Sequence, residues 1–259
     1  MTRGVFIDIK SGFTPTLREF LQKNYNPQRA EKDKAYLYSN LKHYGIASST
    51  RRAFVIKHKN YLKSVVKSAA LKLCTELWNQ PSFEERNCAL SILQLHADSL
   101  DITDMPLIEK IMREAKGWAL LDNSIIPLMP YILAKDKRTY AYLKKWIRDT
   151  DFWVRRSAIL AQLLFFRTGK GGNYQLFFSF AEAQFNESWI DKAYKDSLQR
   201  SRARFFIRKA IGWTLRELSH KNPQLVVGFL NKNKQKMAGL SYREAARRLS
   251  KEYALKLNA

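Results

Sequence analysis

Residues 205–217 read FFIRKAIGWTLRE, and the pattern of this stretch decides the fold class of the chain. On a helix of 3.6 residues per turn, one arc of roughly 60° holds Lys209, Trp213, Arg216 and the following His220. The opposite side is aliphatic and carries Ile207, Ile211 and Leu218. This division predicts an amphipathic helix whose aliphatic side faces a core and whose other side sets a tryptophan among cations.

The tryptophan of this helix has two interpretations. An indole between Lys209 and Arg216 suits stacking on a base or sugar while the cations hold the phosphate backbone beside it. Alternatively, Trp213 packs under the next helix, and the two cationic side chains extend their charged ends into water. The helix alone slightly favours the second interpretation.

The composition indicates a folded protein with a polyanionic partner. The chain has 259 residues, of which 46% are hydrophobic, and its 46 Lys and Arg against 23 Asp and Glu give a net charge of +23. Such an excess is unusual for an enzyme that acts on a small neutral substrate, and it points to DNA, RNA or an acidic membrane surface. Solubility alone rarely needs so large a charge.

The sequence also bounds the compartment. Cys74 and Cys88 have no metal or redox spacing and are expected to be buried thiols in a reducing environment. The first ten residues are too short and polar for a signal peptide, and no apolar run reaches the about 18 residues of a membrane span. We therefore expect a cytoplasmic protein without a membrane anchor.

Helical patterns follow one another from Pro15 onward, whereas Val5, Ile7 and Ile9 alternate with other residues as in a short strand or an ordered arm within residues 1–13. The pattern predicts a helix over 34–44 ended by Gly45, and a helix over 118–133 broken at Pro127 and Pro130. Further helices are expected over 65–78, 83–96, 106–115, 140–147, 152–166, 175–185, 189–197, 204–220, 223–232 and 242–253. The predicted fold class is all-α.

A weak internal echo suggests how these helices are arranged. Residues 83–90, 152–159 and 205–212 each begin with an aromatic residue, carry Arg three positions on, and continue with small and aliphatic residues. This pattern is typical of the second helix in a HEAT-like pair. It predicts one domain over 1–259, a curved solenoid of antiparallel helix pairs with a basic concave groove that fits a duplex. A compact irregular bundle is the alternative.

Two helices carry candidate chemistry. Trp118 and Asp122 lie at i and i+4 and therefore share one helix face, which would frame a carboxylate with an indole. Asp122 is alternatively a helix cap or the partner of a structural arginine. Arg156 is expected to clamp a phosphate or Asp122, or to form an ordinary ion pair between helices.

Other motifs exclude some chemistries. The segment 168–172, Thr-Gly-Lys-Gly-Gly, lacks the spacing of a phosphate-binding loop, and the four histidines show no metal-ligand spacing. No metal or other cofactor is therefore expected. The basic run from Arg200 to Lys209, which includes Arg204 and Arg208, predicts contact with a nucleic-acid backbone, with a solvated face as the alternative.

Taken together, these motifs resemble the signature helices of the AlkD-type alkylpurine DNA glycosylases, a family of HEAT-like-repeat enzymes. The matching segments are 210–217, Trp118-x-x-x-Asp122, 152–160, Gly45-Ile46, Thr50-Arg51-Arg52 and Glu76-Leu77-Trp78 before Pro81. The resemblance covers about Tyr36 to Glu244 in order, and the motifs are specific together although each is weak alone. The chain departs from the family pattern at Gly117, where the family often has a second tryptophan, and is longer over 185–205.

The resemblance implies roles for individual residues. It places Trp118, Asp122 and Trp213 in the catalytic site and matches Arg156 to an essential arginine. It makes Tyr36 an aromatic residue of the same cleft, and it assigns contact with the DNA backbone to Arg51, Arg52 and Arg216. Lys209, Arg204 and Arg208 join the DNA-binding set because of their place in the basic run.

The implied activity is excision of positively charged N3- or N7-alkylated purines from duplex DNA by a monomeric DNA glycosylase in base excision repair. A non-catalytic relative that binds branched or damaged DNA is the alternative, although binding alone does not need the carboxylate of Asp122. A helical repeat that binds RNA or protein is a second rival, and a protein adaptor would show little of the salt dependence of duplex binding.

Overall fold

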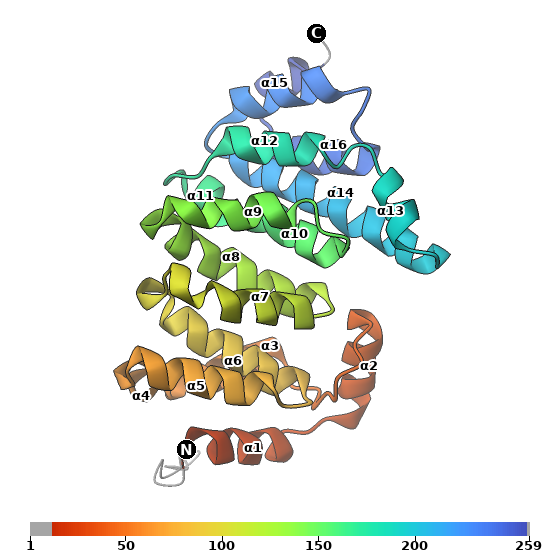
Figure 1. The fold of residues 1–259 in the computed structure, drawn as a ribbon. Helices are drawn as coiled ribbons and strands as arrows, with labels where there is room; N and C mark the ends of the chain where they lie inside the picture. The colour runs from red at the N-terminus through yellow and green to blue at the C-terminus, as the bar shows by residue number, and fades with distance from the viewer. Residues whose placement is uncertain (1–11, 258–259) are drawn as a thin grey trace. The chain divides into compact units, whose positions relative to one another are not determined.

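The computed structural model of the protein describes residues 12–257 (Figure 1). These residues form helices and no β-strand, apart from one isolated backbone bridge between Lys42 and Ser82, so the all-α prediction is confirmed over this range. The arm expected around Val5–Ile9 lies outside the described residues. No helix within 12–257 is both long and apolar enough to cross a membrane.

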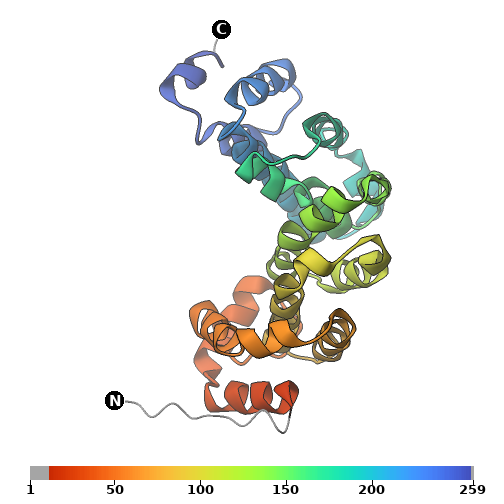
Figure 2. The same ribbon diagram turned by 90° about the vertical axis from the view of Figure 1, so that its left-hand side faces the viewer.

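The contacts divide the chain into two compact units, Met1–Ser99 and Leu100–Ala259. In the first unit, α5 and α6 lie side by side (Figures 1 and 2), joined by a short loop. Both predicted buried thiols, Cys74 and Cys88, lie in this core, and burial raises the pKa of each to about 12. The helices of this unit are α1 (Phe13–Lys23), α2 (Pro27–Leu37), α3 (Ser48–Lys57), α4 (Lys59–Ser64), α5 (Lys67–Trp78), α6 (Phe83–Leu95) and the 3-10 helix η2 (Ala97–Ser99).

The helix predicted over 34–44 is wrong in both bounds. Helix α2 begins at Pro27, where the side chain of Asn26 accepts a hydrogen bond from Arg29 N at 2.9 Å, and it ends at Leu37. The following segment is extended because α6 supplies its hydrogen-bond partners: the Glu84 carboxylate accepts from the backbone N–H of Tyr44 at 3.0 Å. Tertiary contacts therefore override the local helical pattern here.

Gly45 is required by the backbone at this position. Its φ is +66°, and a Cβ added there would lie 2.3 Å from Asn26 O and 2.5 Å from Ala30 N. We expect Gly45→Ala to destabilise the protein by about 1–3 kcal/mol, measured by denaturant unfolding. Gly228→Ala is the control, because its Cβ would meet nothing within 4 Å inside a helix, and it should stabilise slightly. Equal unfolding of wild type and Gly45→Ala would contradict this account.

The second unit is built around its longest helix, α14, which packs against α10, α11, α15 and α16 (Figures 1 and 2). Its aliphatic side is buried as the sequence predicts, with Ile207, Ile211 and Leu218 at most 2% exposed. The helices of this unit are η3 (Ile102–Asp104), α7 (Met105–Glu114), α8 (Trp118–Lys135), η4 (Lys137–Thr139), α9 (Tyr140–Trp146), α10 (Phe152–Leu160), α11 (Leu163–Thr168), α12 (Tyr174–Glu182), α13 (Ser188–Ala193), α14 (Ser197–Ser219), α15 (Pro223–Asn233), α16 (Gly239–Ala246) and α17 (Lys251–Leu255).

Five helix predictions in this unit need correction. Two are the helices expected over 189–197 and 204–220, because α13 already ends at Ala193 and α14 already begins at Ser197. Helix α8 is not broken but continues through Pro127 and Pro130, because its many buried apolar residues pack against α7, α10 and α11. The helix expected over 152–166 is two helices, and at the break the side chain of Gln162 accepts a hydrogen bond from Asn173 N at 2.6 Å. The helix expected over 242–253 is likewise two, α16 and α17, separated at residues 247–250.

Candidate functional site

The centre of the candidate site is an ion pair between α8 and α10. Arg156 Nε donates to Asp122 Oδ1 at 2.9 Å, and Arg156 Nη2 donates to Asp122 Oδ2 at 2.7 Å. The third nitrogen of the guanidinium, Nη1, donates to the backbone carbonyl of Phe206 on α14 at 2.7 Å. Arg156 therefore fixes the carboxylate of α8 to the backbone of α14 through one planar group.

Asp122 keeps access to solvent although it is paired. Its side chain is 13% exposed, whereas that of Arg156 is 5% exposed. An ionised carboxylate has about four lone-pair positions, and Arg156 takes one on each oxygen. The carboxylate can thus accept a further hydrogen bond or face a cation without leaving its partner.

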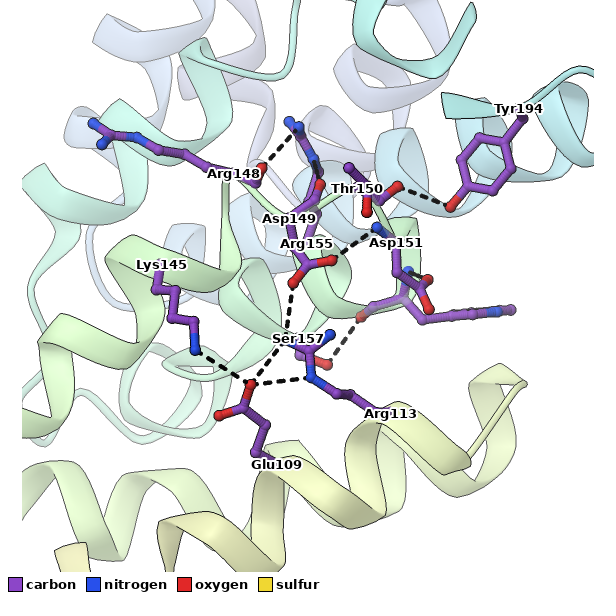
Figure 3. Close-up of polar contacts among 11 residues, drawn as sticks. Glu109, Arg113, Lys145, Arg148, Asp149, Thr150, Asp151, Arg155, Ser157 and Tyr194 are labelled. Carbon is purple, nitrogen blue, oxygen red and sulfur yellow. Dashed lines mark hydrogen bonds and ion pairs between the residues drawn. The ribbon is translucent and has the colours of Figure 1, made fainter. Parts of the chain in front are cut away.

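Contacts from three sides hold the start of α10, which carries Arg156 (Figure 3). Asp151 caps the helix by accepting from Trp153 N at 2.8 Å, and Asp149 accepts from Asp151 N at 2.9 Å and from Arg113 on α7 at 2.9 Å. The hydroxyl of Tyr194, in the loop after α13, accepts from Phe152 N at 2.9 Å and donates to Thr150 O at 3.1 Å. These contacts leave α10 little freedom to move Arg156.

The second feature of the site is the tryptophan of α14. Trp213 is half-buried, and its indole N–H donates to Glu217 Oε1 at 2.9 Å. The other oxygen of Glu217 accepts from Arg167 Nε of α11 at 2.9 Å. Neither sequence interpretation included this carboxylate: Trp213 is anchored through its nitrogen and still partly open to solvent.

Trp118 is the first residue of α8, one turn before Asp122, and is also half-buried. Its place confirms the shared helix face that the i, i+4 spacing predicts. The convergence of Trp118, Asp122 and Trp213 on one substrate stays a prediction.

The four cations of α14 that the sequence assigns to DNA contact all have carboxylate partners. Lys209 and Arg216 bind the two oxygens of Glu244 on α16, at 2.8 Å and 2.6 Å. Arg208 forms a fork with Glu187, at 2.7 Å and 2.6 Å. Arg204 lies 2.6 Å from Asp191 Oδ1 and 3.3 Å from Glu187 Oε2. A phosphate at these positions would have to share or replace a carboxylate.

The stretch 185–205 explains two of these pairs. It forms α13 and the first turns of α14, and it places Glu187 and Asp191 opposite the basic run. Its Trp189 also stacks on Arg155, whose guanidinium carbon lies 3.6 Å from the ring centroid. Residues of this stretch thus hold the basic side chains of α14 and Arg155 near the start of α10.

The remaining predicted residues lie in the first unit. Tyr36 on α2 is 70% exposed, and Arg52 on α3 is also exposed. Arg51 donates to Ile46 O and Ser48 Oγ and lies over the Phe83 ring at 5.4 Å, so it connects α3 with the loop before it and with α6. Burial lowers the pKa of its guanidinium. Their roles in DNA binding stay predictions.

The paired carboxyls of α14 and α16 give a pH prediction. Hydrogen bonding by Lys209 lowers the pKa of Glu244, despite opposing burial. Burial raises the pKa of Glu217, but hydrogen bonds from Arg167 and Trp213 bring it below the ordinary 4.5. A depressed folded-state pKa stabilises the protein above the unfolded value, and this contribution is lost as the pH falls through the folded value. We expect the free energy of unfolding to fall below about pH 4.5, more steeply in wild type than in Glu244→Gln. Identical pH profiles would contradict this.

The net charge of +23 is typical of proteins that bind nucleic acids. The family of DNA alkylation repair enzymes matches residues 17–249, and the chain belongs to this family. The resemblance stated from the motifs is thereby confirmed.

A solved structure described as a predicted DNA alkylation repair enzyme from Enterococcus faecalis has a similar fold. Its TM-score is 0.71 at 20% sequence identity, and the match covers 88% of this chain and 98% of the other. No curated protein matches the chain significantly. The chain therefore has the fold of a DNA alkylation repair enzyme.

Proposed function

We propose that this protein is a DNA glycosylase that excises N3- and N7-alkylated purines, such as 3-methyladenine and 7-methylguanine, from duplex DNA. The observation that carries the proposal is the geometry of Asp122. Its carboxylate is fixed by Arg156 at 2.9 Å and 2.7 Å and remains partly open to solvent. Membership of the DNA alkylation repair family supports the choice of substrate.

The proposed reaction is hydrolysis of the N-glycosidic bond. An N3- or N7-alkylated purine carries a positive charge, so the bond breaks with its electron pair going to the purine, which leaves as a neutral base without protonation. The sugar develops oxocarbenium character, which is the main barrier. Water then adds to C1′ and releases a proton, which leaves an abasic site.

Each site residue has a role in this proposal. Asp122 stabilises the sugar cation electrostatically and orients the attacking water. Trp118 and Trp213 offer π faces to the cationic nucleotide, each contributing about 0.5–2 kcal/mol. Arg156 holds the carboxylate of Asp122 in place. We propose that Tyr36, Arg51, Arg52 and the cations of α14 contact the duplex.

The test is incubation of methylated duplex DNA with the protein, followed by chromatography of the released bases. We expect free 3-methyladenine and 7-methylguanine and a matching number of abasic sites. Release no faster than spontaneous depurination would contradict the proposal. Salt-dependent duplex binding without release would favour the non-catalytic DNA-binding relative, and the absence of salt-dependent binding would favour a protein adaptor.

A further inference from the structure

The second unit contains a buried carboxylate that the proposed reaction does not use. Glu217 lies on α14 one turn after Trp213 and is 9% exposed. Oε1 accepts the indole N–H of Trp213 at 2.9 Å, and Oε2 accepts from Arg167 Nε at 2.9 Å. Because both oxygens are bound by groups from two helices, the carboxylate has one orientation and holds the indole in one as well.

This contact restricts what Trp213 can offer a ligand. Its N–H is already donated to Glu217, so the ring can offer a ligand its π density rather than a hydrogen-bond donor. Donation to an anion shifts electron density into the ring, and a ring richer in electrons attracts a cation more strongly. The pair is therefore suited to a positively charged aromatic ligand.

The same helix links this pair to the carboxylate site. Phe206, whose carbonyl accepts from Arg156, lies seven residues before Trp213, which is two turns along one stripe of α14 and about 10 Å along its axis. Gly212 lets α16 pack directly against this part of the helix, because a Cβ there would lie 2.8 Å from Ser241 O. Glu217, Trp213 and Phe206 thus all lie on α14, and the carbonyl of Phe206 helps to hold Arg156 against Asp122.

We infer that Glu217 is a positioning residue that aims Trp213 and makes its π face selective for a cationic base over a neutral one. The inference rests on the proposed function for its ligand, the alkylated purine. Arg167 supports it by fixing the second oxygen of the carboxylate. The neutral parent base offers nearly the same stacking surface and lacks the N7 methyl group and the positive charge, so an effect of Glu217 on the ratio of the two affinities reports on the charge.

The test is equilibrium binding, which needs no turnover. One duplex carries a single 2′-fluoro-7-methylguanine, whose fluorine keeps the glycosidic bond intact, and a matched duplex carries 2′-fluoroguanine. We expect wild type to prefer the cationic duplex by about 2- to 30-fold, the range of a cation–π contact. Glu217→Gln keeps the shape of the side chain but loses its charge. In this variant, the ratio of the affinities for the cationic and the neutral duplex should fall to the square root of the wild-type ratio or below.

Glu244→Gln is the matched control. Glu244 is also held by two cations, Lys209 and Arg216, whereas the indole N–H of Trp213 donates to Glu217. It should change affinity for both duplexes alike and leave their ratio at the wild-type value. In a Trp213→Phe background, Glu217→Gln should cause no further loss, because the indole N–H is gone.

The outcomes separate this inference from the proposed function. A wild-type preference that Glu217→Gln leaves intact would overturn the inference, as would wild type binding both duplexes equally. Should Glu217→Gln fail to fold by circular dichroism, Arg167→Gln takes its place, with reduced preference expected and an unchanged ratio overturning the inference. The wild-type protein could prefer the cationic duplex, and lose this preference in Glu217→Gln, yet release no base. That result would contradict the glycosylase proposal and support the role of Glu217.

Discussion

Arg156→Ala should destabilise the protein by about 3–5 kcal/mol, because it leaves the largely buried carboxylate of Asp122 without its cation. It also frees the carbonyl of Phe206, so α8, α10 and α14 lose their common contact. Denaturant unfolding measures the loss. Arg156→Lys should recover only part of it, because an ammonium cannot form the two parallel hydrogen bonds of the guanidinium.

The control for this prediction is Arg138→Ala. Arg138 also pairs with an aspartate, Asp136, at 2.6 Å, but its side chain is 80% exposed. Exposed ion pairs contribute little to stability because solvent screens them, so this variant should unfold close to wild type. If Arg156→Ala proved no less stable than Arg138→Ala, Arg156 would not be a structural anchor of the site.

Asp122→Asn should lower the single-turnover rate of base release by about 10²- to 10³-fold, the usual effect of removing one preorganised electrostatic contact. The amide keeps the shape of the side chain and one hydrogen-bond acceptor for Arg156 but cannot stabilise a sugar cation. Affinity for undamaged duplex should stay within about 2-fold of wild type, since Asp122 is not among the residues assigned to the DNA backbone. The rate is measured with enzyme in excess over a duplex that carries one 7-methylguanine.

Asp136→Asn is the control for the charge change, because it removes an aspartate of the same unit that pairs with the exposed Arg138. It should release base at the wild-type rate. Equal rates for wild type and Asp122→Asn would remove Asp122 from the mechanism, even if base release itself were confirmed.

Local sequence patterns were sufficient for the parts of the fold that depend on local spacing. The i, i+4 spacing placed Trp118 and Asp122 on one face of α8, and the aliphatic stripe of α14 is buried as expected. The ion pair between Asp122 and Arg156 was one of the alternatives open for Arg156, and the structure selects it. Its catalytic role remains a prediction.

The helix predictions fail where tertiary contacts decide the local structure. Two prolines normally end a helix, yet α8 passes through both because its core contacts stabilise it. The segment after Leu37 is extended because the carboxylate of Glu84, far along the chain, binds its backbone. No local pattern around residue 40 contains that information.

The charge partners of α14 were also beyond sequence reasoning, with one exception. Glu187, Asp191 and Glu244 lie on other helices, so their pairing with the basic run depends on the packing of α13 and α16. Glu217, in contrast, lies four residues after Trp213, and this spacing alone indicates that the two side chains are neighbours. The contact between Trp213 and Glu217 could therefore have been predicted from their spacing, and the sequence analysis did not include it.

The central claim is that the carboxylate of Asp122 stabilises positive charge at the sugar. The most direct measurement compares affinities for two duplexes, one with a cationic pyrrolidine in place of the sugar at an abasic site and one with a neutral tetrahydrofuran. We expect wild type to bind the pyrrolidine duplex at least about 10-fold more tightly and Asp122→Asn to bind the two nearly equally. Equal affinities in wild type, or the full preference retained in Asp122→Asn, would contradict the claim.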